Sequence, residues 1–149
     1  MKKIILALAV ILTTGLTSAF ANKSEDNNPG AVASFKNDFA NATNISWQHQ
    51  NAYTKATFTL DDQVMYAYYS NDNSELVAVE RNILSRQLPI SLYTSLKKQY
   101  SDYWISGLFE MATPDHTSYY VTLENSNETI VLKGNNSGNW SLYTKTRKI

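Results

Sequence analysis

The sequence has no cysteine, and its 149 residues include only five glycines, three prolines and two histidines. The lack of cysteine excludes a disulfide framework, a thiolate zinc site, a thiol nucleophile and a lipid-modified cysteine. Glycine is also missing from the patterns that carry chemistry, because the chain contains no phosphate-cradling glycine loop and no GxSxG elbow. We therefore expect a protein that is not an enzyme.

Residues that bind metals are equally sparse. His49 and His116 lie far apart in the chain, and neither stands in an HxxxH or HxxE spacing. The acidic pair Asp61-Asp62 falls between two apolar runs, where it is typical of a tight turn. The sequence therefore predicts no metal and no cofactor.

Neither sign of charge dominates, since 13 Lys and Arg residues balance 13 Asp and Glu residues. Binding to nucleic acid or to an anionic membrane surface requires clustered basic side chains. The one basic cluster, residues 145–148, lies at the C-terminal end and is typical of a solvated edge strand. We expect no nucleic-acid partner.

The N-terminal residues have the pattern of a secretory signal peptide. Lys2-Lys3 precede the apolar run Ile4 to Leu12, and Ala19-Phe20-Ala21 precedes the polar Asn22. This pattern predicts a signal peptide over residues 1–21, cleaved after Ala21, and a flexible polar leader over residues 22–28. The apolar run is shorter than the ~20 residues that span a bilayer. We expect a bacterial protein of the periplasm or the extracellular medium, with no membrane insertion after signal removal.

Two segments have the periodicity of amphipathic helices. Apolar residues recur every three or four positions after Pro29, at Phe35 and Phe39, and again after Pro89, at Leu92 and Leu96. The period then changes to two, which predicts four strands after each helix. The expected strands lie near 45–50, 52–60, 63–70, 76–83, 105–112, 118–124, 129–133 and 139–146.

The two halves of this pattern resemble each other, with Tyr66 matching Ile130, Tyr68 matching Leu132 and Leu76 matching Trp140. Internal repetition of this kind defines an architecture. We expect an α+β fold, a tandem repeat of one helix followed by a four-stranded antiparallel meander, with the helices packed on one face of the sheet. A single domain would span residues 29–149, with repeats of about 29–85 and 86–149.

Matched positions should face the same side of the sheet, and the more apolar set should face the helices. The expected inward residues are Phe58, Leu60, Tyr66, Tyr68, Leu76, Ala78, Val121, Leu123, Ile130, Leu132, Trp140 and Leu142. Alternation then places Lys55, Ala67, Val79, Thr122, Val131 and Lys145 outside, together with five candidate anchors for a binding partner: Tyr53, Met65, Tyr69, Tyr120 and Tyr143. Tyrosine and methionine favour protein interfaces, although tyrosine and threonine are also ordinary strand formers.

The order of these features resembles a known family. A helix, Ile45-Ser46-Trp47, four strands, a linker ending in Leu88-Pro89, and a second helix with four strands are similar to the PepSY-like family of exported Bacteroidetes proteins. That family resembles the β-lactamase inhibitory protein in fold. The resemblance implies an antiparallel sheet presented to a partner; it does not imply that this chain inhibits a β-lactamase.

Three functions remain open from the sequence. The first is a protein-binding or inhibitor-like module that binds an exported protein or peptide as a monomer or weak homodimer. The second is a carrier of a small apolar ligand, of cystatin-like or lipocalin-like type. The third is a structural protein that associates with itself through the outward face.

Overall fold

The computed structural model describes residues 28–149. The expected signal peptide (1–21) and all but the last residue of the expected leader (22–28) lie outside the described residues. The helices are α1 (Pro29–Asp38), the short 3-10 helix η1 (Ser85–Gln87) and α2 (Ile90–Gln99). The strands are β1 (Thr43–His49), β2 (Tyr53–Leu60), β3 (Gln63–Ser70), β4 (Leu76–Asn82), β5 (Trp104–Ala112), β6 (Thr117–Glu124), β7 (Glu128–Asn135) and β8 (Trp140–Arg147).

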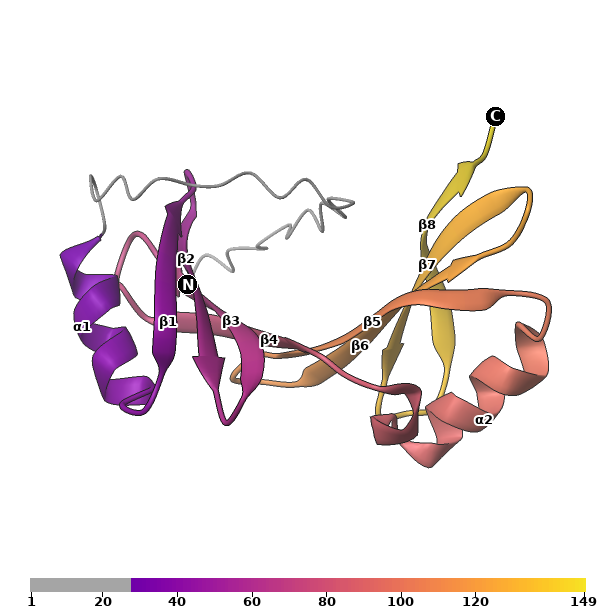
Figure 1. The fold of residues 1–149 in the computed structure, drawn as a ribbon, viewed down its shortest axis with the longest axis horizontal. Helices are drawn as coiled ribbons and strands as arrows, with labels where there is room; N and C mark the ends of the chain where they lie inside the picture. Colours follow the sequence, from indigo (N-terminus) through magenta and orange to yellow (C-terminus); the bar gives the residue numbers. More distant parts are fainter. Residues whose placement is uncertain (1–27) are drawn as a thin grey trace.

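All eight strands belong to one sheet, in the order β1 to β8, and each strand is antiparallel to the next. The sheet twists strongly, so that α1 lies at one end beside β1 to β3 and α2 lies at the other end near β7 and β8 (Figure 1). Most connections are short turns, whereas the segment between β4 and β5 contains η1 and α2.

The predicted fold class, a tandem repeat of one helix and a four-stranded meander, is wrong. The described chain is mostly one eight-stranded antiparallel sheet with only two α-helices. The pairing of β4 with β5, which includes Val79 opposite Ala112 and Arg81 opposite Glu110, makes the sheet continuous. Two separate meanders would leave two additional strand edges with unpaired backbone groups, and this pairing removes them.

Both α-helices pack on the same face of this sheet, which we call the helix-covered face. Residues directly opposite each other in neighbouring strands share a face. The pairs Phe58 with Met65 and Ala56 with Ala67 therefore place these side chains together under α1. The pair Val121 with Leu132 likewise lies under α2.

Helix α1 begins where the sequence supplies a cap. Asn28 accepts hydrogen bonds through Oδ1 from the backbone N–H groups of Gly30, at 3.0 Å, and Ala31, at 3.3 Å. Pro29 suits the first helical position because it has no N–H group to satisfy. The helix then buries Phe35, which is 1% exposed, against Phe58 at a ring-centroid distance of 4.9 Å.

Helix α2 is held against the other end of the sheet by Leu92 and Trp140. Leu92 is fully buried, and its carbonyl oxygen accepts a hydrogen bond of 3.0 Å from the indole Nε1 of Trp140. Gly134 of β7 lies beneath both side chains, where a Cβ atom would approach each of them to 2.9 Å. Only glycine leaves enough space for α2 to pack this closely.

The sheet faces predicted for several residues of β3 and β4 are wrong. Tyr66, Tyr68 and Ala78 lie on the face opposite the helices, whereas Ala67 and Tyr69 lie under α1. Val79, opposite Ala67, also lies on the helix-covered face and not outside. The cause is the two-residue turn at Asp61-Asp62, both with positive φ, which pairs Leu60 with Gln63 and Phe58 with Met65. The structural match to Ile130 is therefore Met65 and not Tyr66, and a slip of one residue exchanges the two faces of a strand. Lys145 also differs, since it pairs opposite Ile130 on the helix-covered face.

Replacing Phe35 by alanine tests the docking of α1. We expect Phe35→Ala to lower the free energy of unfolding by about 3–5 kcal/mol, because it removes a buried ring among Phe39, Trp47 and Phe58. Lys36→Ala, on the exposed side of the same helix, should change it by less than about 0.5 kcal/mol. Urea denaturation measures both, and equal losses in the two variants would contradict this packing.

Tyr69 provides a test by pH. Its hydroxyl donates a 2.9 Å hydrogen bond to Oδ2 of Asp38, and burial, followed by this bond, raises the pKa of Tyr69. Because the folded-state pKa lies above the unfolded value, the stabilisation is complete below about pH 10 and decreases at higher pH. Tyr69→Phe should cost about 1 kcal/mol at pH 7. It should also lose less stability than the wild type between pH 9 and 11, and parallel pH profiles from urea denaturation would refute this.

Candidate functional site

The sheet face that neither α-helix covers, which we call the helix-free face, carries a cluster of apolar and aromatic side chains. Its buried members are Tyr68, Ala78, Phe109, Met111, Tyr120 and Val131. Tyr53, Tyr66 and Val77 are partly buried against this cluster. The cluster draws on both halves of the chain, and it lies where β3 to β7 run side by side.

The rings of this face contact one another directly. Phe109 and Tyr120 stack with centroids 4.9 Å apart and planes 11° from parallel. Tyr143, which is 45% exposed, meets Tyr120 edge-on at 5.6 Å, and Tyr53 meets Tyr68 in the same way at 5.4 Å. These distances fall in the favourable range for aromatic pairs, so the rings form a pre-organised surface.

Two charged residues balance each other in the first half of the face. The hydroxyl of Tyr68 donates a 2.6 Å hydrogen bond to Oε2 of Glu80. Lys55 places its ammonium group 4.3 Å from the ring centroid of Tyr66 and 5.5 Å from that of Tyr68. Burial lowers the pKa of Lys55, and burial together with Glu80 raises the pKa of Tyr68.

A second lysine, Lys133, lies in the other half of the helix-free face. The ammonium group of Lys133 is 5.5 Å from the ring centroid of Tyr120. Among residues 28–149 it forms no ion pair with a carboxylate. Its cation–π contact positions the charge beside the aromatic cluster without neutralising it.

The structure brings three of the five predicted anchors together. Tyr53, Tyr120 and Tyr143 lie on the helix-free face. Met65 and Tyr69 instead pack against α1 on the other side of the sheet, and Tyr69 is fully buried. The assignment of Met65 and Tyr69 to the outward face is therefore wrong, for the register reason given above.

Sequence reasoning missed five residues of this cluster: Tyr66, Tyr68, Ala78, Phe109 and Met111. The alternation of Phe109 and Met111 in β5 was visible in the sequence, but nothing local indicated which face they occupy. The two-residue Asp61-Asp62 turn was the signal that could have placed Tyr66 and Tyr68, since a tight hairpin fixes the register of its strands.

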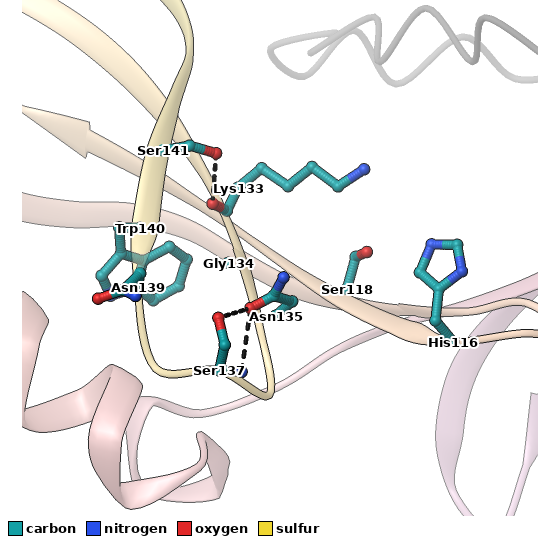
Figure 2. Close-up of a pocket in the computed structure, with 9 residues that line it drawn as sticks. All are labelled: His116, Ser118, Lys133, Gly134, Asn135, Ser137, Asn139, Trp140 and Ser141. Carbon is teal, nitrogen blue, oxygen red and sulfur yellow. Dashed lines mark hydrogen bonds between the residues drawn. The ribbon is translucent and has the colours of Figure 1, made fainter.

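A pocket lies at the end of β6, β7 and β8 (Figure 2). Its residue Lys133 lies opposite Tyr120 of the aromatic cluster in the pairing of β6 with β7. The volume of the pocket is about 340 Å³, and its polar lining includes His116, Ser118, Lys133, Asn135, Ser137 and Ser141. Lys133 belongs to both regions, because it lines the pocket and its ammonium group lies 5.5 Å from the ring centroid of Tyr120. The pocket and the aromatic cluster thus form one continuous surface.

Within residues 28–149 no group of three or more His, Asp or Glu side chains is placed to hold a metal ion. The described helices are also too short and too polar to cross a membrane. The arrangement that remains is a surface of aromatic rings, hydroxyl groups and lysines.

No family model and no curated protein matches this sequence. Several solved structures match its fold. A BLIP-like protein from Bacteroides fragilis is 17% identical, with a TM-score of 0.70, and the match covers 84% of this chain and 89% of that one. A DUF2874 family protein from Bacteroides ovatus is 14% identical, with a TM-score of 0.72 and coverages of 83% and 89%. A candidate periplasmic protein from Bacteroides eggerthii is 13% identical, with a TM-score of 0.70 and coverages of 79% and 86%.

These identities establish the fold and no more. The chain is similar to BLIP-like and DUF2874 family structures of Bacteroides, and its architecture is BLIP-like, that is, similar to the β-lactamase inhibitory protein. The likeness to the PepSY-like family stays a resemblance of sequence pattern.

Proposed function

We propose that this chain is a non-enzymatic binding module of the bacterial periplasm or cell exterior, and that it binds an exported protein or peptide through its helix-free face. One observation carries the proposal: both α-helices cover the same side of the sheet, yet the other side also holds a packed aromatic cluster. A sheet face that only met water would need no such cluster, because antiparallel sheets commonly expose a polar face.

The composition of this face fits a protein partner. Tyrosine supplies a large contact area with little side-chain entropy and a hydroxyl for hydrogen bonding, and it is enriched among residues that dominate interface energies. Tyr53 and Tyr66 are half-buried and Tyr143 is exposed. The buried rings of Tyr68 and Tyr120 contact Tyr53 and Tyr143, respectively.

The alternatives fit the structure less well. A carrier of apolar ligands needs a cavity lined by apolar side chains. The pocket at the end of β6 to β8 is instead lined by serine, asparagine, histidine and lysine. Self-association through the helix-free face would make the mass of the particle depend on concentration, which light scattering measures.

Export is part of the proposal. The N-terminal pattern has the features of a signal peptide, and one structural neighbour is a candidate periplasmic protein. When the full chain is expressed in its source bacterium, we expect intact-mass spectrometry of the purified protein to show a mature form that begins at Asn22. Recovery of the uncleaved chain in the cytoplasmic fraction would contradict export.

The binding face is tested by affinity capture with the full chain carrying a C-terminal tag. We expect an exported protein to be captured by the wild type and by Tyr93→Ala, a control on α2. Tyr53→Ala/Tyr143→Ala should lose at least about tenfold in affinity, since both rings would leave the interface. Melting temperatures would verify that all three proteins fold. Equal capture by the double variant and the wild type would refute the proposed face.

A further inference from the structure

The pocket beside the aromatic cluster has an excess of hydrogen-bond donors. Ser118 is only 4% exposed and lines the pocket, and its hydroxyl makes no hydrogen bond to any residue in 28–149. Asn135 uses Oδ1 to accept hydrogen bonds from the backbone N–H of Ser137, at 3.0 Å, and from the Ser137 hydroxyl. The amide nitrogen of Asn135 therefore remains available as a donor.

The donors converge on one side of the strands. Ser118 lies opposite Asn135 in the pairing of β6 with β7, and Lys133 is two residues before Asn135 on the same face. In Figure 2 the Lys133 ammonium group, the Ser118 hydroxyl and the His116 ring all extend to the same side of the sheet. His116 is held in the β5–β6 turn by contacts with Thr113, including a 3.0 Å hydrogen bond that the Thr113 hydroxyl donates to the His116 carbonyl oxygen.

The charge of the pocket has one sign. Lys133 and His116 are its only ionisable lining residues, and no carboxylate lines it. Of the other lysines on this side of the sheet, Lys55 lies in the field of Glu80 and Lys148 forms a 2.8 Å ion pair with Glu124. Lys133 is therefore the cation of this face that is available to an incoming anion.

We propose that this pocket binds a carboxylate group presented by the protein partner, either an acidic side chain or a C-terminus. One ammonium group with neutral serine and asparagine donors matches a single negative charge, whereas a phosphate dianion is usually met by several cations or by arginine. The volume of about 340 Å³ admits a whole side chain, since one water molecule occupies only about 30 Å³ of liquid. The inference rests on the proposed function, because the carboxylate belongs to the partner of the helix-free face.

The test uses the full-length protein and three probes. N-acetylglutamine carries only a C-terminal carboxylate, N-acetylglutamate α-methylamide carries only a side-chain carboxylate, and N-acetylglutamine α-methylamide is the neutral control. We expect a carboxylate probe, and not the neutral control, to give saturable NMR shifts at the backbone amides of Ser118, Gly134 and Ser141; the tighter of the two carboxylate probes identifies the source of the carboxylate. Lys133→Met keeps the apolar stem and removes the charge, and should weaken binding about tenfold. Lys55→Met is the matched control on the same face and should bind as the wild type does. Unchanged amide spectra away from the pocket verify folding of both variants.

Three results would overturn the inference: equal shifts with the neutral control and the carboxylate probes, no saturable shift with either carboxylate probe, or equal losses in the two lysine variants. Tighter binding of inorganic phosphate than of both carboxylate probes would also overturn it in favour of a phosphate ligand. The titration needs no partner, so its failure is separate from failure of the proposed function. If Tyr53→Ala/Tyr143→Ala abolishes capture while Lys133→Met has no effect in either assay, the binding face stands and the carboxylate pocket does not.

Discussion

The pairing of β4 with β5 is the constraint on which the rest of this structure depends. Four residue pairs, from Val79 with Ala112 to Asn82 with Phe109, join the two halves of the chain into one sheet. On the helix-covered face the apolar clusters under α1 and α2 are separate, and the ion pair between Arg81 and Glu110, at 3.1 Å, lies between them. On the helix-free face a single cluster spans the junction. The side chains that hold the halves together are therefore the same ones that make the proposed binding surface.

Local signals in the sequence predicted where the helices and strands lie along the chain. They did not predict how these elements are arranged in the sheet. The period of Phe35 and Phe39 identified α1, and Pro29 marked its start, because these features depend on residues within a few positions of each other. The junction could not be predicted in this way, since β4 and β5 are separated by η1 and α2. Whether two meanders stay apart or join depends on backbone pairing between distant residues, which no local pattern records.

For the candidate site, too, the sequence predicted what local residues decide and not what strand register decides. Matching Tyr66 to Ile130 aligned the two halves one residue away from their structural match, and that single slip placed Met65 and Tyr69 on the wrong face. The assignments for Val121, Leu123, Ile130 and Leu132 were correct, and in β6 the alternation of Val121 and Leu123 with Thr122 marks the inward face. In β3 both faces carry tyrosine, Tyr69 on one and Tyr66 and Tyr68 on the other, so composition could not detect the slip. The pocket was invisible for a different reason: the β5–β6 turn supplies His116, and the β7–β8 turn supplies Ser137.

The two halves share an architecture but differ in charge, and that difference bears on how a partner is oriented. In the first half Lys55 and Glu80 compensate each other beside Tyr68. In the second half Lys148 pairs with Glu124, whereas Lys133 forms no ion pair among the described residues. Aromatic contacts supply affinity but tolerate several orientations, while charged groups fix the register of an interface. A partner that places its carboxylate at Lys133 has one way to lie across the tyrosines. Rotated by half a turn, it would bring the same carboxylate against Glu80, and the repulsion between like charges would disfavour that orientation.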